Sequence, residues 1–412
     1  MKPGQIPWKI LIMLCATATA SYICRVNVST VGPLLMHEFN LSQISMGQVF
    51  SAFLLGYALF QIPAGILADR WGARRVLTLA AWLWVVMTIL QTFAGLGIFH
   101  TTLTISVVAF MVCRFLLGIA ESPIYPGSAQ GVSNWFLPQF QGRANGIIIA
   151  SIGLGSAITP PLVSNIMIHF GWRPAILVSA IPAFIIAIIW LYIREPIPSE
   201  ITNSESKENL NSLVLIKGRR LRTPSFILLT VSYTLQGYVG YIFVTWFYLY
   251  LVQVRHFSLL SGAWMSSLPW ILSIISIPLG GFVSDRLAQS SMGIKWGRRI
   301  VPIIGMAMSG ILISIGAHTG IPMIAAVSLA FATAFILFVE GPFWTMMMNL
   351  AGTKSGTAGG IMNMGSNLGG LISPALTPVI ASFLGWENAL HIAAGLAIIA
   401  SVLWFGIKPD KM

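Results

Sequence analysis

Apolar segments of about twenty residues recur along the whole chain, separated by short polar stretches. An α-helix needs about 20 apolar residues to cross a hydrocarbon core about 30 Å thick. The segments are apolar on every face, whereas strands of a membrane β-barrel would alternate apolar and polar residues. The pattern therefore predicts twelve spanning helices, over residues 9–36, 44–67, 76–96, 103–127, 143–168, 174–193, 225–252, 261–284, 300–317, 322–350, 356–383 and 388–407.

The composition agrees with this interpretation. Of the 412 residues, 56% are hydrophobic and 8% are charged, with a mean hydropathy of +0.83, which is far more apolar than a soluble chain of this length. The first apolar segment is long enough to span and lacks the small-residue cleavage site of a secretory signal, so we expect it to remain as the first helix. The chain is thus expected to be an all-α, polytopic membrane protein.

The positive charges predict the orientation in the membrane. Of 23 Lys and Arg residues, 19 fall in the terminal segments or in the loops after the even-numbered helices, and only Arg173 and Arg255 lie on the opposite side. Lys and Arg concentrate in cytoplasmic loops, so both termini are expected to be cytoplasmic. Orientation alone accounts for the net charge of +12, and we infer no nucleic-acid partner from it.

The two halves of the chain resemble each other. GIIIASIGLGSAITPPLV begins at Gly146 and GIMNMGSNLGGLISPALT at Gly360, and the following FGWRPAI and LGWENAL place Gly171 against Gly385, again 214 positions away. Six helices precede and six follow a polar, basic stretch. The predicted domains are a six-helix bundle over 1–195, a cytoplasmic linker over 196–224 and a second bundle over 225–412. Parallel halves of this kind are typical of transporters, in which they rock about a site at their interface.

The loop after the second helix makes the prediction more specific. GILADRWGARR, residues 65–75, resembles the signature loop of the major facilitator superfamily, and the second half repeats it as GGFVSDRLAQSSMGIKWGRR. The resemblance implies twelve helices in the major facilitator fold. A helix-end acid facing loop arginines and a helix N-terminus would form a contact that one conformation keeps and the other releases. The candidate gating residues are Asp69, Arg70, Arg74, Asp285 and Arg286.

Arg25, Arg114 and Glu121 are charged residues that lie inside predicted membrane spans. Arg25 and Arg114 each cost about 2.5–3.5 kcal/mol at a helix centre on a translocon scale, so they need partners or water. Arg114 and Glu121 are seven positions apart, which places them on one helix face but about 10.5 Å apart along the axis. A permanent pair with a carboxylate would make the arginines packing charges. Otherwise they are free to face an anionic ligand, and Glu121 can carry a proton.

Several segments are similar to the anion:cation symporter family, which includes proton symporters of sugar acids. The matching segments are SYICRVNVSTVGPLL, FLLGYALFQIPAG, CRFLLGIAESPIYPG, TWFYLYLV and GGIMNMGSNLGGLISPAL. The resemblance implies that Arg25 and Tyr57 bind the substrate carboxylate. It also implies that Glu121 carries the coupling proton with help from Arg114, and that Trp344 and Asn363 contact a sugar acid. The implied partners are a small anion and protons, with no cofactor.

Two positions depart from that pattern, and one acid is additional. Cys24 replaces an acid that commonly precedes the helix 1 arginine, and Ser151 stands where galactonate-type members carry a glutamine. Glu340 is not required by the family pattern. It is either a second proton carrier or a group near water at the Gly341–Pro342 break.

The remaining polar residues leave alternatives open. The six histidines all map to the external side, one per hairpin, and are too dispersed to argue for a metal site. Gln61, Gln236, Tyr238 and Tyr241 are cavity-lining groups or helix–helix hydrogen bonds.

No catalytic or nucleotide-binding motif supports an enzyme or a primary pump. The rivals on the same fold are an exporter of a larger amphiphile, drug or siderophore, and a phosphate or organophosphate transporter. Short loops suggest a bacterial inner membrane. Two bundled halves need no second copy, so we expect a monomer.

Overall fold

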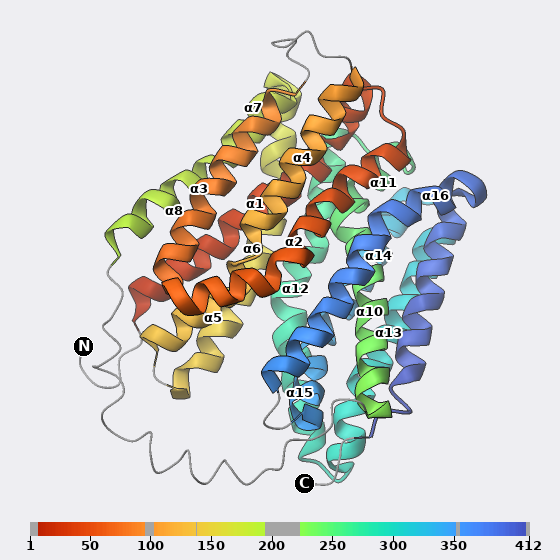
Figure 1. Ribbon diagram of the computed structural model, residues 1–412. Coiled ribbons are helices and arrows are strands. Elements are labelled where there is room, and N and C mark those ends of the chain that lie inside the picture. Colours follow the sequence, from red (N-terminus) through yellow and green to blue (C-terminus); the bar gives the residue numbers. More distant parts are fainter. Residues whose placement is uncertain (1–6, 95–102, 137, 194–222, 352–354, 409–412) are drawn as a thin grey trace.

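The computed structural model describes residues 7–94, 103–136, 138–193, 223–351 and 355–408. Within these ranges the regular structure is entirely helical (Figure 1). The first half contains α1 Trp8–Glu38, α2 Gln43–Trp71, α3 Ala73–Thr92, α4 Leu103–Glu121, α5 Ile124–Trp135, α6 Pro138–Phe170, α7 Trp172–Ser179 and α8 Ile181–Tyr192. The second half contains α10 Pro224–Thr245, α11 Phe247–Gln253, α12 Leu259–Ala288, α13 Gly293–His318, α14 Pro322–Phe338, α15 Glu340–Ala351 and α16 Ser355–Leu403.

The predicted spans are confirmed. Eleven helical segments of the described chain are long and apolar enough to cross a membrane, and the eleventh, Ala358–Leu403, contains two of the predicted spans. Gly385 has φ 84° and ψ 159° inside α16, so the helix axis breaks there. Four other predicted spans consist of two consecutive helices, as in α4–α5 and α14–α15. Most of the linker, residues 194–222, lies outside the described residues.

The internal repeat is visible in the backbone. Gly171 and Gly385 both precede a tryptophan and both have a positive φ, 85° and 84°. Glycine adopts this conformation without the steric cost that a Cβ would bring. Each glycine therefore turns the chain at the external side, between the fifth and sixth spans of its half.

The two halves lie side by side, the first in red to yellow-green and the second in green to blue (Figure 1). Two helix pairs join them over much of their length, α2 with α16 and α6 with α12. On α2, Ser51 Oγ donates to the Leu371 carbonyl at 2.9 Å. On α6, Ser164 Oγ donates to the Leu259 carbonyl at 3.0 Å. Within the halves, α1 packs against α6, α4 against α2 and α10 against α16.

The spans that carry Glu121 and Glu340 are each broken at that acid. α4 ends at Glu121 and α5 begins at Ile124, after Pro123. α14 ends at Phe338 and α15 begins at Glu340, two residues before Pro342. Proline lacks an N–H and clashes with the preceding turn, so it interrupts a helix near these points. The second break lies two residues earlier than the Gly341–Pro342 position expected from the sequence.

A close crossing of α2 and α4 fixes the first of these acids. A Cβ added at Gly118 would lie 2.0 Å from the Phe53 carbonyl oxygen, and one at Gly56 would lie 2.1 Å from the Phe115 carbonyl oxygen. Only glycine permits this approach. The crossing places the Phe53 ring of α2 against Arg114 of α4, and the same ring contacts Arg25 of α1.

Candidate functional site

Arg25, at the middle of α1, lies in a cage of aromatic rings. Its guanidinium carbon is 5.0 Å from the Tyr22 ring centroid, 4.9 Å from Phe53, 4.9 Å from Tyr57 and 5.6 Å from Tyr241. The guanidinium donates to the Tyr241 hydroxyl at 2.7 Å and to the Tyr22 hydroxyl at 3.4 Å. The side chain forms no salt bridge with any acid that the structure describes. Neutral π-faces and hydroxyls thus hold this cation, leaving its charge uncompensated.

Arg114, on α4, is buried and also lies against the Phe53 ring. Its guanidinium carbon lies 4.7 Å from that ring centroid, and one NH2 group donates to the Arg25 backbone carbonyl at 3.2 Å. The remaining nitrogens, Nε and Nη1, have no hydrogen-bond partner among the described residues. A buried guanidinium with free donors is costly to maintain. Arg114 is therefore a second cation with unused hydrogen-bonding capacity.

One small cavity lies against both arginines. Its lining combines Arg25, Ser29, Phe53 and Arg114 of the first half with Tyr241 and Thr245 of the second. The cavity is therefore at the interface of the halves, and the only charged side chains that line it are the two arginines. Guanidinium groups bind carboxylate, sulfonate and phosphate oxygens through charge-assisted, often bidentate hydrogen bonds. The chemistry of this cavity fits a small anion.

Glu121, the last residue of α4, is fully buried near this cavity. Neither carboxylate oxygen has a hydrogen-bond partner in the described chain, and the residue forms a salt bridge with neither arginine. It nevertheless interacts electrostatically with both Arg25 and Arg114. The expectation that Arg114 and Glu121 are too far apart along the helix to satisfy each other is thus confirmed.

The other residues predicted in this region fall into two groups. Tyr57 is buried, and its ring lies against Arg25 and stacks on Phe53 with centroids 6.2 Å apart. Ser151 donates instead to the Ile147 carbonyl of its own helix at 2.9 Å. Cys24 is fully buried, with its thiol 3.6 Å from the Ser179 carbonyl of α7. Tyr57 therefore belongs to the arginine cage, whereas neither Ser151 nor Cys24 lines the cavity.

Glu340 is the centre of a second polar cluster, in the second half. Tyr233 donates a short hydrogen bond to Oε1, Trp344 Nε1 donates to the same oxygen at 3.0 Å, and Gln236 Nε2 donates to Oε2 at 3.3 Å. The Trp344 and Tyr233 rings are also in edge contact, with centroids 6.4 Å apart. The carboxylate therefore fixes the position of Trp344, one of the residues predicted to contact substrate.

Asn363, another predicted substrate contact, joins the two halves. Its amide nitrogen donates to Gln61 Oε1 at 3.0 Å, and Asn367 donates to the same oxygen at 3.2 Å. Gln61 belongs to α2 of the first half. In this conformation Asn363 is thus part of a bridge between the halves rather than of the arginine cavity.

The predicted gating residues make contacts within one half. Asp285 pairs with Arg298 at the start of α13. Arg74 donates to the Trp190 and Leu191 carbonyls at 3.3 and 2.5 Å, at the end of α8. Arg70 and Arg286 are exposed, and the side chain of Asp69 lies outside the described residues. The expected contact across the cytoplasmic gate stays a prediction.

Some residues of the site were not identified from the sequence. Tyr22 and Phe53 lie within segments quoted for the family resemblance, and Tyr233 lies outside them. None of the three was singled out, because an aromatic residue in a membrane span is most often packing. Gln61, Gln236, Tyr238 and Tyr241 each form a hydrogen bond with another helix, which is one of the two predicted alternatives. Tyr241 also lines the cavity, so both alternatives apply to it. A usable signal did exist: both acids within the spans stand in a Glu-x-Pro sequence, Glu121-Ser-Pro and Glu340-Gly-Pro.

Comparisons with known proteins agree with the fold. A probable sulfoacetate transporter of Cupriavidus necator is 31% identical over 97% of this chain and 93% of its own length. The hexuronate transporter of Bacillus subtilis is 28% identical over 95% and 92%, and a D-galactonate transporter of Escherichia coli is 26% identical over 99% and 97%. A crystal structure of a D-xylose–proton symporter has a TM-score of 0.76 at 16% identity, covering 98% of both chains.

A solved bacterial homologue of the human lysosomal transporter Spinster, in an inward-facing and occupied conformation, gives a TM-score of 0.79 at 17% identity. It covers 98% of this chain and 97% of that one. The family model of the Major Facilitator Superfamily matches residues 13–374 and again 290–412. The chain is a multi-pass membrane protein. Fold, repeat and family match lead to one conclusion: this chain belongs to the major facilitator superfamily.

Proposed function

We propose that this protein is a secondary active transporter that couples proton movement to the transport of a small organic anion. The observation that carries the proposal is the cavity between the halves, which two arginines without a salt-bridge partner line together. Relatives named for sulfoacetate, hexuronate and galactonate transport support a carboxylate or sulfonate as the substrate class. Alternating access follows from the two-bundle design.

Arg25 is proposed to bind the anion. Its cage of four aromatic rings holds the guanidinium without neutralising it, so an incoming carboxylate gains a charge-assisted bond and removes an uncompensated charge. Tyr57 and Tyr241 lie on either side, and Tyr241 comes from the opposite half. Substrate binding at Arg25 would therefore compete with the Tyr241 contact and change how the halves hold together.

Glu121 is proposed to carry the proton. A buried carboxylate with no hydrogen-bond donor is costly to keep ionised, and protonation or the approach of a cation removes that cost. Both arginines act on Glu121 electrostatically. An anion that neutralises Arg25 or Arg114 therefore changes the electrostatic environment of Glu121, which links proton and substrate occupancy.

The test is uptake into proteoliposomes. Sulfoacetate, hexuronates, aldonates, aldarates, acidic amino acids and phosphate would each be offered with an inward proton gradient, and again after an ionophore has collapsed it. Gradient-dependent accumulation of a carboxylate or sulfonate is expected. Accumulation of phosphate alone would favour the phosphate alternative. Failure of every anion, together with release of a large amphiphile or chelator from loaded vesicles, would overturn the symport proposal in favour of an exporter.

Substitution of Arg25 tests the binding role. Arg25→Ala should weaken binding by about 100-fold, because it removes hydrogen bonds to a charged group worth about 1.5–3 kcal/mol each. Arg25→Lys keeps the charge but loses the planar donor pair, so it should bind with intermediate affinity. Unchanged substrate affinity in both variants, measured by calorimetry in detergent, would remove Arg25 from the site.

A further inference from the structure

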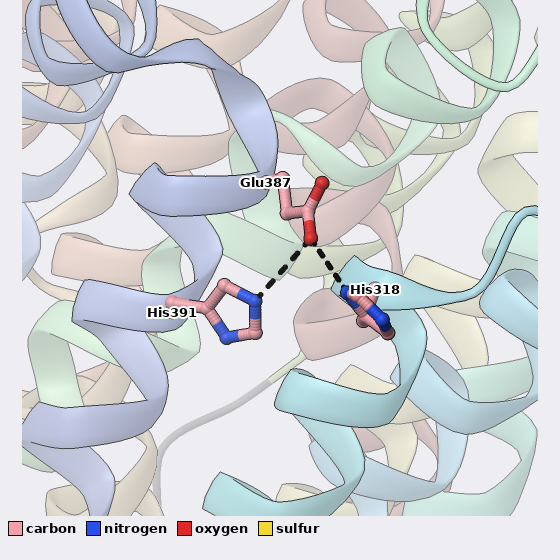
Figure 2. Close-up of side chains that lie close together, drawn as sticks. All are labelled: His318, Glu387 and His391. Carbon is pink, nitrogen blue, oxygen red and sulfur yellow. Dashed lines mark hydrogen bonds and ion pairs between the residues drawn. The ribbon is translucent and has the colours of Figure 1, made fainter.

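Two histidines and a glutamate converge at the external end of the second half (Figure 2). His318 Nδ1 lies 2.9 Å from Glu387 Oε1, and His391 Nε2 lies 3.7 Å from the same oxygen. One ligand atom from each of the three side chains lies within 4.8 Å of the other two. The cluster is separate from the arginine cavity and from the Glu340 cluster.

The turn at Gly385 and the end of α13 create this arrangement. His318 is the last residue of α13, and Glu387 and His391 stand one helical turn apart just after the break in α16. Residues four apart lie on the same helix face, so both point towards the end of α13. The histidines are dispersed along the sequence, which argued against a metal site. In the folded chain, however, His318 and His391 lie close together.

The corresponding corner of the first half is held by a different set of residues. Position 173, 214 before Glu387, is an arginine. Arg173 pairs with Glu38 at 2.7 Å and donates to the Thr92 and Ala94 carbonyls at the end of α3. The arginine thus joins the end of α1 to the end of α3.

In the second half another residue binds the end of the matching helix. Arg255 donates to the Thr319 carbonyl at 2.6 Å and to the Gly316 and Ala317 carbonyls at 2.8 Å. Glu387 therefore does not have to bind α13 in the way that Arg173 binds α3. Among the described residues, its ion-pair partners are the two histidines alone.

This set of ligands matches the preference of a zinc-type ion. Zn²⁺ binds imidazole nitrogen and carboxylate oxygen at about 2.0–2.2 Å, and two histidines with one glutamate leave a position for water. A tetrahedron with such bonds has edges of about 3.4 Å. The two nitrogen–oxygen separations are 2.9 and 3.7 Å, and the three ligand atoms all lie within 4.8 Å of one another. Rotation of the side chains can bring the ligand atoms to the tetrahedral separation, because the side chains are partly free to move. Their exposed fractions are 83% for His318, 52% for Glu387 and 36% for His391.

We propose that His318, Glu387 and His391 form a binding site for a zinc-class transition-metal ion that enters from the external side. The ion takes one nitrogen from each imidazole and one carboxylate oxygen, and water completes its coordination. It replaces the direct contact between His318 and Glu387, and it links α13 to the part of α16 beyond Gly385. Binding therefore stabilises the external corner of the second half, whatever substrate the protein transports.

The test uses the purified full chain without a histidine tag. ZnCl₂ should bind with a stoichiometry of one in calorimetry and raise Tm in a concentration-dependent manner, because it binds the folded state. MgCl₂, which prefers oxygen ligands, should do neither. His318→Ala, Glu387→Gln and His391→Ala should each weaken Zn²⁺ binding by at least about tenfold, since even outer-shell partners act on this scale.

The matched control is His37→Ala, an exposed histidine at the external end of α1. It should bind Zn²⁺ like the unchanged protein. Tm in EDTA reports whether each variant is folded. Binding should also weaken as the pH falls, because the metal competes with protons for the imidazoles. Absence of one-to-one binding, or equal binding by all four variants, would overturn the proposal.

Discussion

Glu121 and Glu340 occupy matching places in the two halves but differ in their hydrogen bonds. Each is an acid at the break of the fourth span of its half, and each is followed two residues later by proline. Neither oxygen of Glu121 has a partner among the described residues, whereas Glu340 accepts from Tyr233, Gln236 and Trp344. This difference in hydrogen bonding distinguishes two roles, proton exchange and the positioning of neighbouring side chains, which the sequence alone did not assign to one acid or the other. A carboxylate without donors is suited to exchange a proton, and one with three donors is suited to hold its neighbours in place.

The electrostatic surroundings differ in the same direction. Glu121 interacts with two arginines that line the cavity between the halves. Glu340 is surrounded by neutral donors, one of which is Trp344. We therefore assign the main coupling role to Glu121 within the proposed mechanism, and to Glu340 the positioning of Trp344. The suggestion that Glu340 is a second proton carrier stays open to the experiments below.

The largest effect is expected from Glu121→Gln. The amide keeps the shape of the side chain and cannot take up a proton, so proton-driven accumulation should fall to the level reached without a gradient. Exchange of internal for external anion should persist, because Arg25 remains. The measurement compares gradient-driven uptake with counterflow in proteoliposomes. Substantial uphill uptake by this variant would show that Glu121 is not the coupling group.

Glu340→Gln should give the opposite pattern. Accumulation should continue, but KM should rise about tenfold, because a hydrogen bond to a charged acceptor contributes about 1.5–3 kcal/mol and Trp344 would lose one. The new amide N–H group would also face donors, so Tm should fall. In Glu121→Gln, which loses no hydrogen bond, Tm should not fall. Loss of accumulation with unchanged KM would instead make Glu340 a proton carrier.

Tyr233→Phe tests the Glu340 cluster more gently. It removes one of the three donors but keeps the ring that packs against Phe343, at 4.9 Å between centroids. Leaving one acceptor site less satisfied costs about 1–3 kcal/mol, so a lower Tm and a rise in KM of a few fold are expected. An unchanged KM would mean that Trp344 does not depend on the cluster for its position.

The smallest effect is expected from Tyr238→Phe, on the same helix. The Tyr238 hydroxyl contacts the Thr377 hydroxyl at 3.2 Å and no acid. A neutral hydrogen bond contributes about 0.5–1.5 kcal/mol, so Tm should fall slightly while KM and accumulation stay as in the unchanged protein. A change in KM as large as that of Tyr233→Phe would show that KM responds to any lost hydroxyl on α10, and that the hydrogen bonds to Glu340 have no particular effect on it.

Much of the fold could be predicted from the sequence because its cause is local. Each span is set by the length of its apolar run, and the glycines at positions 171 and 385 mark the same turn in both halves. Arg25, Arg114 and Glu121 were identifiable because charge is rare and costly in a membrane span. Their spacing also indicated correctly that Arg114 and Glu121 do not satisfy each other.

The tertiary structure decided which side chains meet. Tyr241 reaches Arg25 across the interface of the halves, and Glu387 reaches His318 across 69 positions of sequence. Contacts of this kind depend on how the helices cross. Glycines such as Gly118 allow two helices to approach closely, and the hydrophobic pattern of the sequence does not predict this approach. The sequence by itself determined how many spans there are, how they repeat and which charges they contain. Packing decided which charges remain without partners, because a hydrogen bond needs two atoms within about 3 Å of each other.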